Sequence, residues 1–122
     1  DGGRRKAEVA RTEAVLKEQL SAFSEVYLTA VKELDDGFAR ERFLEEHILE
    51  IVREQKAARG MLNQTRFRYR KGIGNYPDIL RSKQHVLDTD RRLLDARRLR
   101  LSGRISLYRA LSGTRVRAAG GG

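Results

Sequence analysis

Apolar residues recur through the first part of the chain at the spacing of one helical face. The recurring residues are Leu16, Leu20, Phe23, Tyr27, Val31, Leu34 and Phe38, followed by Leu44, Ile48, Ile51, Ala58 and Leu62. Residues separated by steps of three and four lie along one side of an α-helix. The pattern therefore predicts a long amphipathic helix over about residues 4–71.

The second part of the chain has a stricter repeat. Residues seven apart are Leu80, Leu87, Leu94, Leu101 and Tyr108, and they are flanked by Ile79, Val86, Leu93 and Leu107. A seven-residue repeat held over four heptads is typical of a helix that packs along a partner helix by knobs-into-holes contacts. It predicts a returning helix over about residues 77–112, with Gly113 as a C-cap. The tail, residues 114–122, has no such periodicity, and we expect it to be disordered.

The segment between the two repeats, "RYRKGIGNYPDILR", has the composition of a turn. Gly72 is able to take the left-handed conformation that ends many helices. Pro77 fits within the first turn of a helix, and Asp78 beside it favours a helix N-terminus. The sequence therefore predicts a tip turn at residues 72–76 and an all-α fold, a long helical hairpin with coiled-coil-like packing.

The two predicted arms differ in length. At about 1.5 Å per residue, the first arm is roughly 100 Å long and the second about 50 Å. A break at Asp35, Asp36 and Gly37 would instead give a compact three-helix bundle. A continuous helix would tolerate Gly37 at about 1 kcal/mol and take its missing partner from other chains or from another part of the same protein. Periodicity alone leaves both alternatives open.

Composition narrows the class of protein. The chain has 122 residues, 39% hydrophobic and 35% charged, with one Pro, no Trp and no Cys, as expected for a single helical domain. No apolar run reaches the roughly 20 residues of a membrane-spanning helix. Because the chain begins at Asp1 rather than Met, we expect it to be a piece of a longer product.

The net charge of +9 is uneven, with +2 in residues 1–71 and +7 in residues 72–122. A surplus of this size suits an anionic partner. Interleaved Glu and Arg are also typical of a solvated helix face with mixed charge. A basic helical protein that binds nucleic acid through the Arg-rich residues 91–109 is the alternative from another class, but no recognised binding motif accompanies the charge.

Candidate chemistry is sparse. His85 and Asp88 lie three apart, but further metal ligands are missing and an exposed hydrogen-bonded pair is favoured. His47 stands alone. The glycines near Gly72 follow no strand and match no phosphate-binding motif. We therefore expect no enzyme activity, no metal and no cofactor.

Four segments, taken in order, carry a resemblance to a known family: "DGGRRKAEVARTEA", "VKELDDGFA", "RFRYRKGIGNYPDIL" and "ISLYRALSG". Over residues 1–113 the chain resembles TolC-type outer-membrane efflux proteins, most closely the branch that serves multidrug pumps. The resemblance implies a fragment of the C-terminal half with the second periplasmic hairpin. In that family a long helix descends to a periplasmic tip, and a shorter one returns and is continued end to end by a helix from elsewhere in the protein.

By the same resemblance, three protomers form an α-barrel in the periplasmic portion of a bacterial outer-membrane protein. The implied function is a passive exit channel of a tripartite pump that exports small molecules across the outer membrane. The implied partners are a periplasmic adaptor, or membrane fusion protein, and an inner-membrane pump, with no nucleic acid. The alternative is the basic nucleic-acid-binding protein or a stand-alone three-helix-bundle interaction protein.

The resemblance also assigns roles to tip residues. Lys71, Gly72 and Ile73 match the motif that adaptor hairpins contact. Tyr69 matches an aromatic latch residue, and Asp78 an acid that faces the tip aperture.

Other gate positions depart from the family pattern. Gly74 stands where TolC has a latch arginine, and Arg81 stands where a second aperture acid is usual. Pro77 occupies the place of an apolar constriction residue. The predicted gate is thus Tyr69, Pro77, Asp78 and Arg81, and the departures leave its closing mechanism open.

Overall fold

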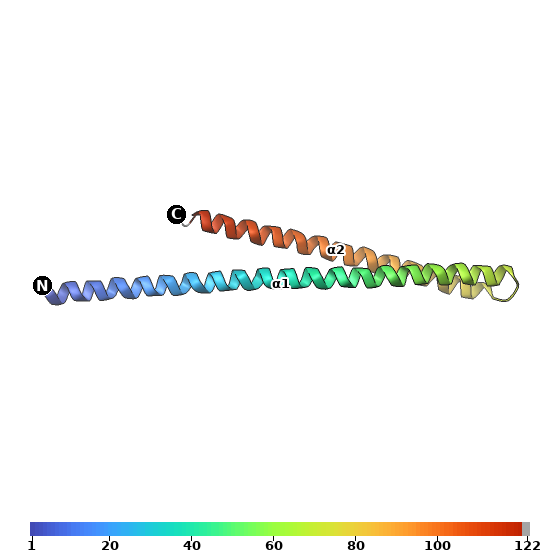
Figure 1. The fold of residues 1–122 in the computed structure, drawn as a ribbon, viewed down its shortest axis with the longest axis horizontal. Helices are drawn as coiled ribbons and strands as arrows, with labels where there is room; N and C mark the ends of the chain where they lie inside the picture. Colours follow the sequence, from blue (N-terminus) through green and yellow to red (C-terminus); the bar gives the residue numbers. More distant parts are fainter. Residues whose placement is uncertain (121–122) are drawn as a thin grey trace. The chain divides into compact units, whose positions relative to one another are not determined.

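Two α-helices joined by a short turn make up the described chain (Figure 1). The computed structural model describes residues 1–120, and it describes side-chain surroundings through Gly113. Helix α1 spans Gly2–Arg70, and helix α2 spans Tyr76–Gly120. Residues 1–120 contain no strand. The predicted all-α helical hairpin is confirmed.

Helix α1 runs through Asp35, Asp36 and Gly37 without interruption. The three-helix bundle, which needed a turn here, is therefore wrong. The structure also gives the reason for a glycine at this position. A Cβ atom on Gly37 would lie 2.5 Å from Cδ2 of Leu107, so the missing side chain makes room for a residue of α2.

Contacts between residues divide the chain into two units. One unit is residues 37–108, and the other combines residues 1–36 with the chain from Arg109 on. Within residues 1–36, only Ala30 and Leu34 are partly buried. The apolar residues of the predicted stripe are exposed there, namely Leu16, Leu20, Phe23, Tyr27 and Val31.

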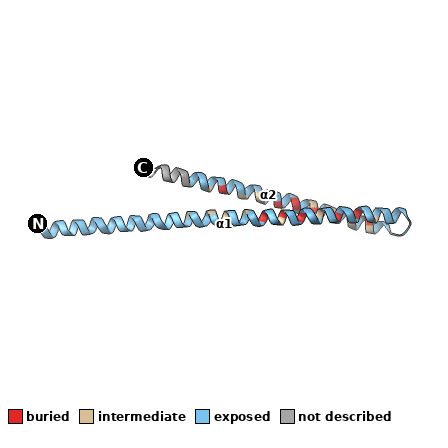
Figure 2. Ribbon diagram, viewed as in Figure 1, coloured by how far each residue is buried: buried red, intermediate tan, exposed pale blue. Residues whose placement is uncertain are grey.

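The core lies in residues 37–108, where facing sides of α1 and α2 are buried (Figure 2). Helix α1 contributes Leu44, Ile48, Ile51, Ala58 and Leu62, as its apolar periodicity predicts. Helix α2 contributes two rows of buried or half-buried residues, each with a seven-residue repeat. The large row contains Ile79, Val86, Leu93, Arg100 and Leu107, and the small row contains Ser82, Thr89, Ala96 and Gly103.

The residues with the most regular leucine repeat do not face α1. We call Leu80, Leu87, Leu94, Leu101 and Tyr108 the leucine row, and they are exposed by 50%, 50%, 52%, 61% and 74%. The heptad periodicity of α2 is confirmed, but the flanking large row packs on α1. The small row explains this choice, because short side chains beside the large row allow two helices to approach closely.

Polar contacts between the helices fix the antiparallel register. As residue numbers rise along α1, those of the partners on α2 fall: Glu41 with Arg104 at 2.6 Å, Glu45 with Arg100 at 2.7 Å, Gln55 with Asp90 at 2.5 Å, and Thr65 with Ser82 at 3.2 Å. The hydrogen bond to Glu41 raises the pKa of the Arg104 guanidinium. The two exposed Glu–Arg pairs contribute little stability by themselves, but all four contacts agree on one register.

Helix α2 ends later than the sequence indicated. It extends to Gly120, whereas the periodicity of the sequence predicted an end near Ser112 and a disordered tail after it. Gly113 is tolerated inside a helix at about 1 kcal/mol, and the Arg and Ala residues that follow are good helix formers. Residues 121–122 of the predicted tail lie outside the described residues. Among the described residues, no helix is both long and apolar enough to cross a membrane.

Candidate functional site

The tip turn begins with a Schellman motif. The N–H of Gly72 donates to the carbonyl of Tyr69 at 3.0 Å, and the N–H of Ile73 donates to the carbonyl of Arg68 at 2.9 Å. Gly72 has a φ of 78°, in the left-handed region that favours glycine. Its lack of a side chain therefore ends α1 and reverses the chain.

An asparagine cap begins α2 on the other side of the turn. The Oδ1 atom of Asn75 accepts a hydrogen bond from the N–H of Asp78 at 3.0 Å, as an N-cap residue does. Pro77 lies in the first turn, where a missing N–H leaves no helical hydrogen bond unmade. The carboxylate of Asp78 is in the same turn, where the helix dipole favours negative charge.

Two predicted gate residues contact each other within α2. The Nη2 atom of Arg81 lies 2.6 Å from Oδ1 of Asp78, across one turn of the helix. Both side chains remain substantially exposed, Arg81 by 76% and Asp78 by 45%. The acid is therefore paired within its own chain.

Two aromatic contacts also occur at the tip. The ring of Tyr69 meets that of Tyr76 at a centroid distance of 6.1 Å and a 60° tilt, which joins the end of α1 to the start of α2. Lys71 places its ammonium 5.5 Å from the ring centroid of Phe67, within range of a cation–π interaction. Pro77, the remaining predicted gate residue, is exposed beside them.

Ile73 is the apolar residue of the turn, and it is 67% exposed. In a Schellman motif the residue after the glycine often packs on an apolar residue in the last helical turn. The corresponding residue here is Arg68, whose carbonyl closes the motif. Lys71, Gly72 and Ile73 are all exposed, so the structure brings the predicted adaptor-contact residues together at the surface of the turn.

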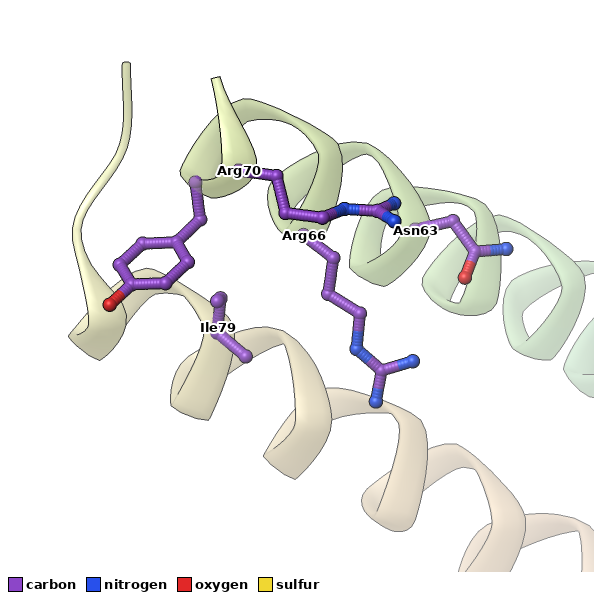
Figure 3. A pocket seen from close by; sticks show the side chains of 5 residues that line it. Asn63, Arg66, Arg70 and Ile79 are labelled. Atoms are coloured by element: carbon purple, nitrogen blue, oxygen red, sulfur yellow. The ribbon is translucent and has the colours of Figure 1, made fainter. Parts of the chain in front are cut away.

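Two open grooves lie beside the turn. We call the first the tip groove; Figure 3 shows it, and its lining residues are Asn63, Arg66, Tyr69, Arg70 and Ile79. The second is lined by Met61, Gln64, Thr65, Arg68, Ile73, Gly74, Asp78, Arg81 and Ser82. Asn63 and Arg66 are not among the site residues predicted from the sequence. The signal that was available is the basic run "RFRYRK" at the end of α1.

The other sequence candidates do not form a chemical site. Asp88, a proposed partner of His85, accepts a hydrogen bond from Nε2 of Gln84 at 3.0 Å. His47 stacks on the ring of Phe43 at a centroid distance of 6.0 Å. No group of three or more His, Asp or Glu residues is placed to hold a metal ion in the part of the chain that the structure describes.

The Arg-rich face of residues 91–109 is partly neutralised. Arg92, Arg100 and Arg104 form ion pairs with glutamates of α1, at 2.5, 2.7 and 2.6 Å. Their charge is therefore used between the helices, which weakens the nucleic-acid alternative.

A family model described as "Outer membrane efflux protein" matches residues 1–113, which include the tip turn and both of its grooves. Searches of the curated proteins and of the solved structures found no match.

Proposed function

The chain belongs to the outer membrane efflux protein family, and we propose that it supplies the second periplasmic hairpin of a trimeric exit duct. Small molecules would leave through the duct across the outer membrane. The duct would be passive and catalyse no reaction, because an inner-membrane pump supplies the energy. A periplasmic adaptor, or membrane fusion protein, would join the two.

The observation that carries this proposal is that α2 has two apolar rows. The large row packs on α1, while the leucine row, one residue further along at each repeat, is exposed. Adjacent residues of a helix are about 100° apart around its axis. A helix in a closed ring touches one neighbour on each side, so it needs an apolar row toward each of them, and the leucine row is an apolar row that α1 leaves exposed. The leucine row would contact a neighbouring helix of the barrel.

Helix α1 supports the same assembly. Its exposed residues Val9, Leu16 and Phe23 are seven apart and lie in the same heptad phase as the buried residues Leu44 and Ile51. All five residues therefore lie on one side of α1. A helix that packs against Leu44 and Ile51 would, if it were continued, also pack against the exposed group. We propose that another helix of the same protein continues α2 end to end and covers these residues.

The tip would have two roles. Lys71, Gly72 and Ile73 would contact the adaptor, and the exposure of Ile73 supports this role because it leaves an apolar side chain ready for burial. The gate would consist of Tyr69, Pro77, Asp78 and Arg81. In a three-fold assembly, Asp78 and Arg81 would form adjoining rings of opposite charge.

The test introduces charge on the leucine row of the full-length protein. We expect the double variant Leu87→Glu and Leu94→Glu to lose the trimer on native gels and to lose efflux in cells that lack their own duct. The control is Ser102→Glu with Ser106→Glu, which adds the same charge at exposed polar positions of α2. A leucine-row variant that still forms trimers and exports as well as the control would overturn the proposal.

A further inference from the structure

Positive charge is concentrated at the tip end of the hairpin. Residues 55–83 contain eight Lys or Arg residues and one acid, Asp78. This segment therefore holds a surplus of seven out of the net charge of +9. Asp78, which is already counted in this surplus, is paired with Arg81 at 2.6 Å and does not pair with the other cations.

The heptad register shows where an acid is missing. Arg59 of α1 lies 3.5 Å from Asp90 of α2, on one side of the helix pair. Seven residues nearer the tip on each helix, the equivalent positions hold Arg66 and Lys83. Because the packing repeats every seven residues, two cations stand where an ion pair occurs one heptad away.

Further hydrogen-bond donors line the tip groove beside Arg66. Arg66 and Arg70 are four residues apart on α1, so they share one side of the helix, and Asn63 precedes Arg66 by three. In Figure 3, Arg66 extends from α1 toward α2, Arg70 runs along α1 toward Asn63, and Ile79 lies on α2. Within the described chain, no ion pair or hydrogen bond joins the side chain of Arg66 or Arg70 to an acid. Like charges at this spacing destabilise a helix, so the arrangement favours an anion from outside.

We propose that the tip groove binds the carboxylate of an Asp or Glu side chain in an acidic segment of a partner protein. The planar guanidinium of Arg matches a carboxylate with two parallel hydrogen bonds. The amide of Asn63 is a further donor, and Tyr69 and Ile79 offer apolar contact to the methylene groups of the acidic side chain.

The arrangement of cations favours a protein over other polyanions. Apart from Arg59, which is paired with Asp90, the cations Lys56, Arg66 and Arg70 follow α1 in steps of ten and four, along one side of the helix. Acids on one face of a partner segment recur at matching steps. The inference does not depend on the proposed efflux function, since the groove and its charges belong to the chain itself.

The test measures binding of a fluorescein-labelled peptide to the full chain by fluorescence anisotropy. In the peptide, glutamates recur at about every fourth residue, and in the control peptide glutamines replace them. We expect the double variant Arg66→Gln and Arg70→Gln to weaken binding of the glutamate peptide about tenfold or more. Circular dichroism checks that the variant remains helical.

The matched control is Arg91→Gln with Arg98→Gln. These arginines are exposed on α2 and form no ion pair among the described residues, so the control removes the same charge elsewhere. We expect it to weaken binding less than about twofold, as for exposed charges outside a contact. Equal losses of affinity for the glutamate peptide in the two double variants would overturn the proposed binding site. General electrostatic attraction to the basic chain would then explain the binding.

Competition identifies the kind of anion. Free glutamate and inorganic phosphate test whether a small anion is sufficient, and a DNA duplex tests the nucleic-acid alternative. We expect the peptide to resist millimolar free glutamate and phosphate and to outcompete the duplex. Displacement by either small anion would overturn the assignment to a protein segment. Tighter binding of the duplex that depends on Arg66 and Arg70 would overturn it as well. Trimer formation tests the proposed function separately, because neither arginine belongs to the leucine row.

Discussion

Gly37 of α1 lies directly against Leu107 of α2: a Cβ atom at Gly37 would be 2.5 Å from Cδ2 and 3.2 Å from Cγ of the leucine. Leu107 is buried and belongs to the large row of the core. The glycine therefore permits a close contact between helices inside an unbroken helix. A side chain at this position has to displace Leu107 from its place.

We expect Gly37→Ala to have opposite effects in two backgrounds. Alanine favours the helix by about 1 kcal/mol, whereas overpacking costs about 1 to 3 kcal/mol. The substitution should therefore destabilise the native chain. With Leu107→Ala in place, the clash disappears and the same substitution should stabilise it. Urea unfolding followed by circular dichroism measures both effects, and a stabilised single variant would show that Leu107 moves aside freely.

Leu93 and Leu94 offer a matched comparison of the two faces of α2. Their exposures are 6% and 52%. We expect Leu93→Ala to lower the free energy of unfolding by about 2 to 5 kcal/mol, as for a buried leucine, and Leu94→Ala to change it little in the isolated chain. In the full-length protein, Leu94→Ala should instead weaken the proposed trimer. Similar losses for the two variants in the isolated chain would contradict the assignment of faces.

The same two leucines show which part of the fold was readable from sequence. The helices and the turn were predicted because local chemistry decides them: apolar periodicity, the left-handed Gly72 and the first-turn position of Pro77. The packed face was not, since Leu93 and Leu94 are the same residue type with the same repeat. Which of the two rows packs on α1 depends on the small row and on the ion pairs with α1. These ion pairs are known only once the two helices are paired.

The ambiguity at Gly37 and the omission of Arg66 have related causes. Glycine suits both a turn and a close contact, and only the position of Leu107 distinguishes the two. Arg66 belongs to a basic run that is typical of a helix C-terminus. Its lack of an acidic partner became apparent from the opposing position of Lys83, which depends on the register.

Arg100 interrupts the large row with a charge. Its Nη2 atom lies 2.7 Å from Glu45, but its buried Nε atom has no hydrogen-bond partner within the described chain. We expect Arg100→Leu to stabilise the hairpin by about 1 kcal/mol, because it removes an unsatisfied donor and leaves Glu45 in solvent. Thermal unfolding measures the effect. A loss of stability would show that the ion pair outweighs the buried donor.

Lys83 of α2 stands at the position where an acid would pair with Arg66 of α1. We expect Lys83→Glu to form an ion pair with Arg66 like that between Arg59 and Asp90, and to stabilise the chain by about 0.2 to 1 kcal/mol. The gain should shrink at high salt. The new carboxylate should also compete for the tip groove and weaken binding of the glutamate peptide. Arg98→Glu, at an exposed position of α2, is the control for a charge reversal outside the groove. Equal effects of the two reversals on peptide binding would contradict the opposed placement of Arg66 and Lys83.

Arg81 gives the last prediction, which concerns ion selectivity of the proposed duct. In a three-fold aperture, Arg81 would neutralise the acidic ring of Asp78, since the two side chains already meet at 2.6 Å within one helix. We expect Arg81→Asp in the full-length protein to raise the preference for cations clearly in planar bilayers, because two acidic rings would replace a compensated pair. The exposed ion pair contributes only about 0 to 1 kcal/mol, so its loss should leave the fold intact.

Two further variants serve as controls for Arg81→Asp. Arg81→Gln should give an intermediate reversal potential, and Arg91→Asp, the same charge reversal further along α2, should leave selectivity unchanged. If Arg81→Asp and Arg91→Asp shift the reversal potential equally, Arg81 does not face the aperture and is not a gate residue.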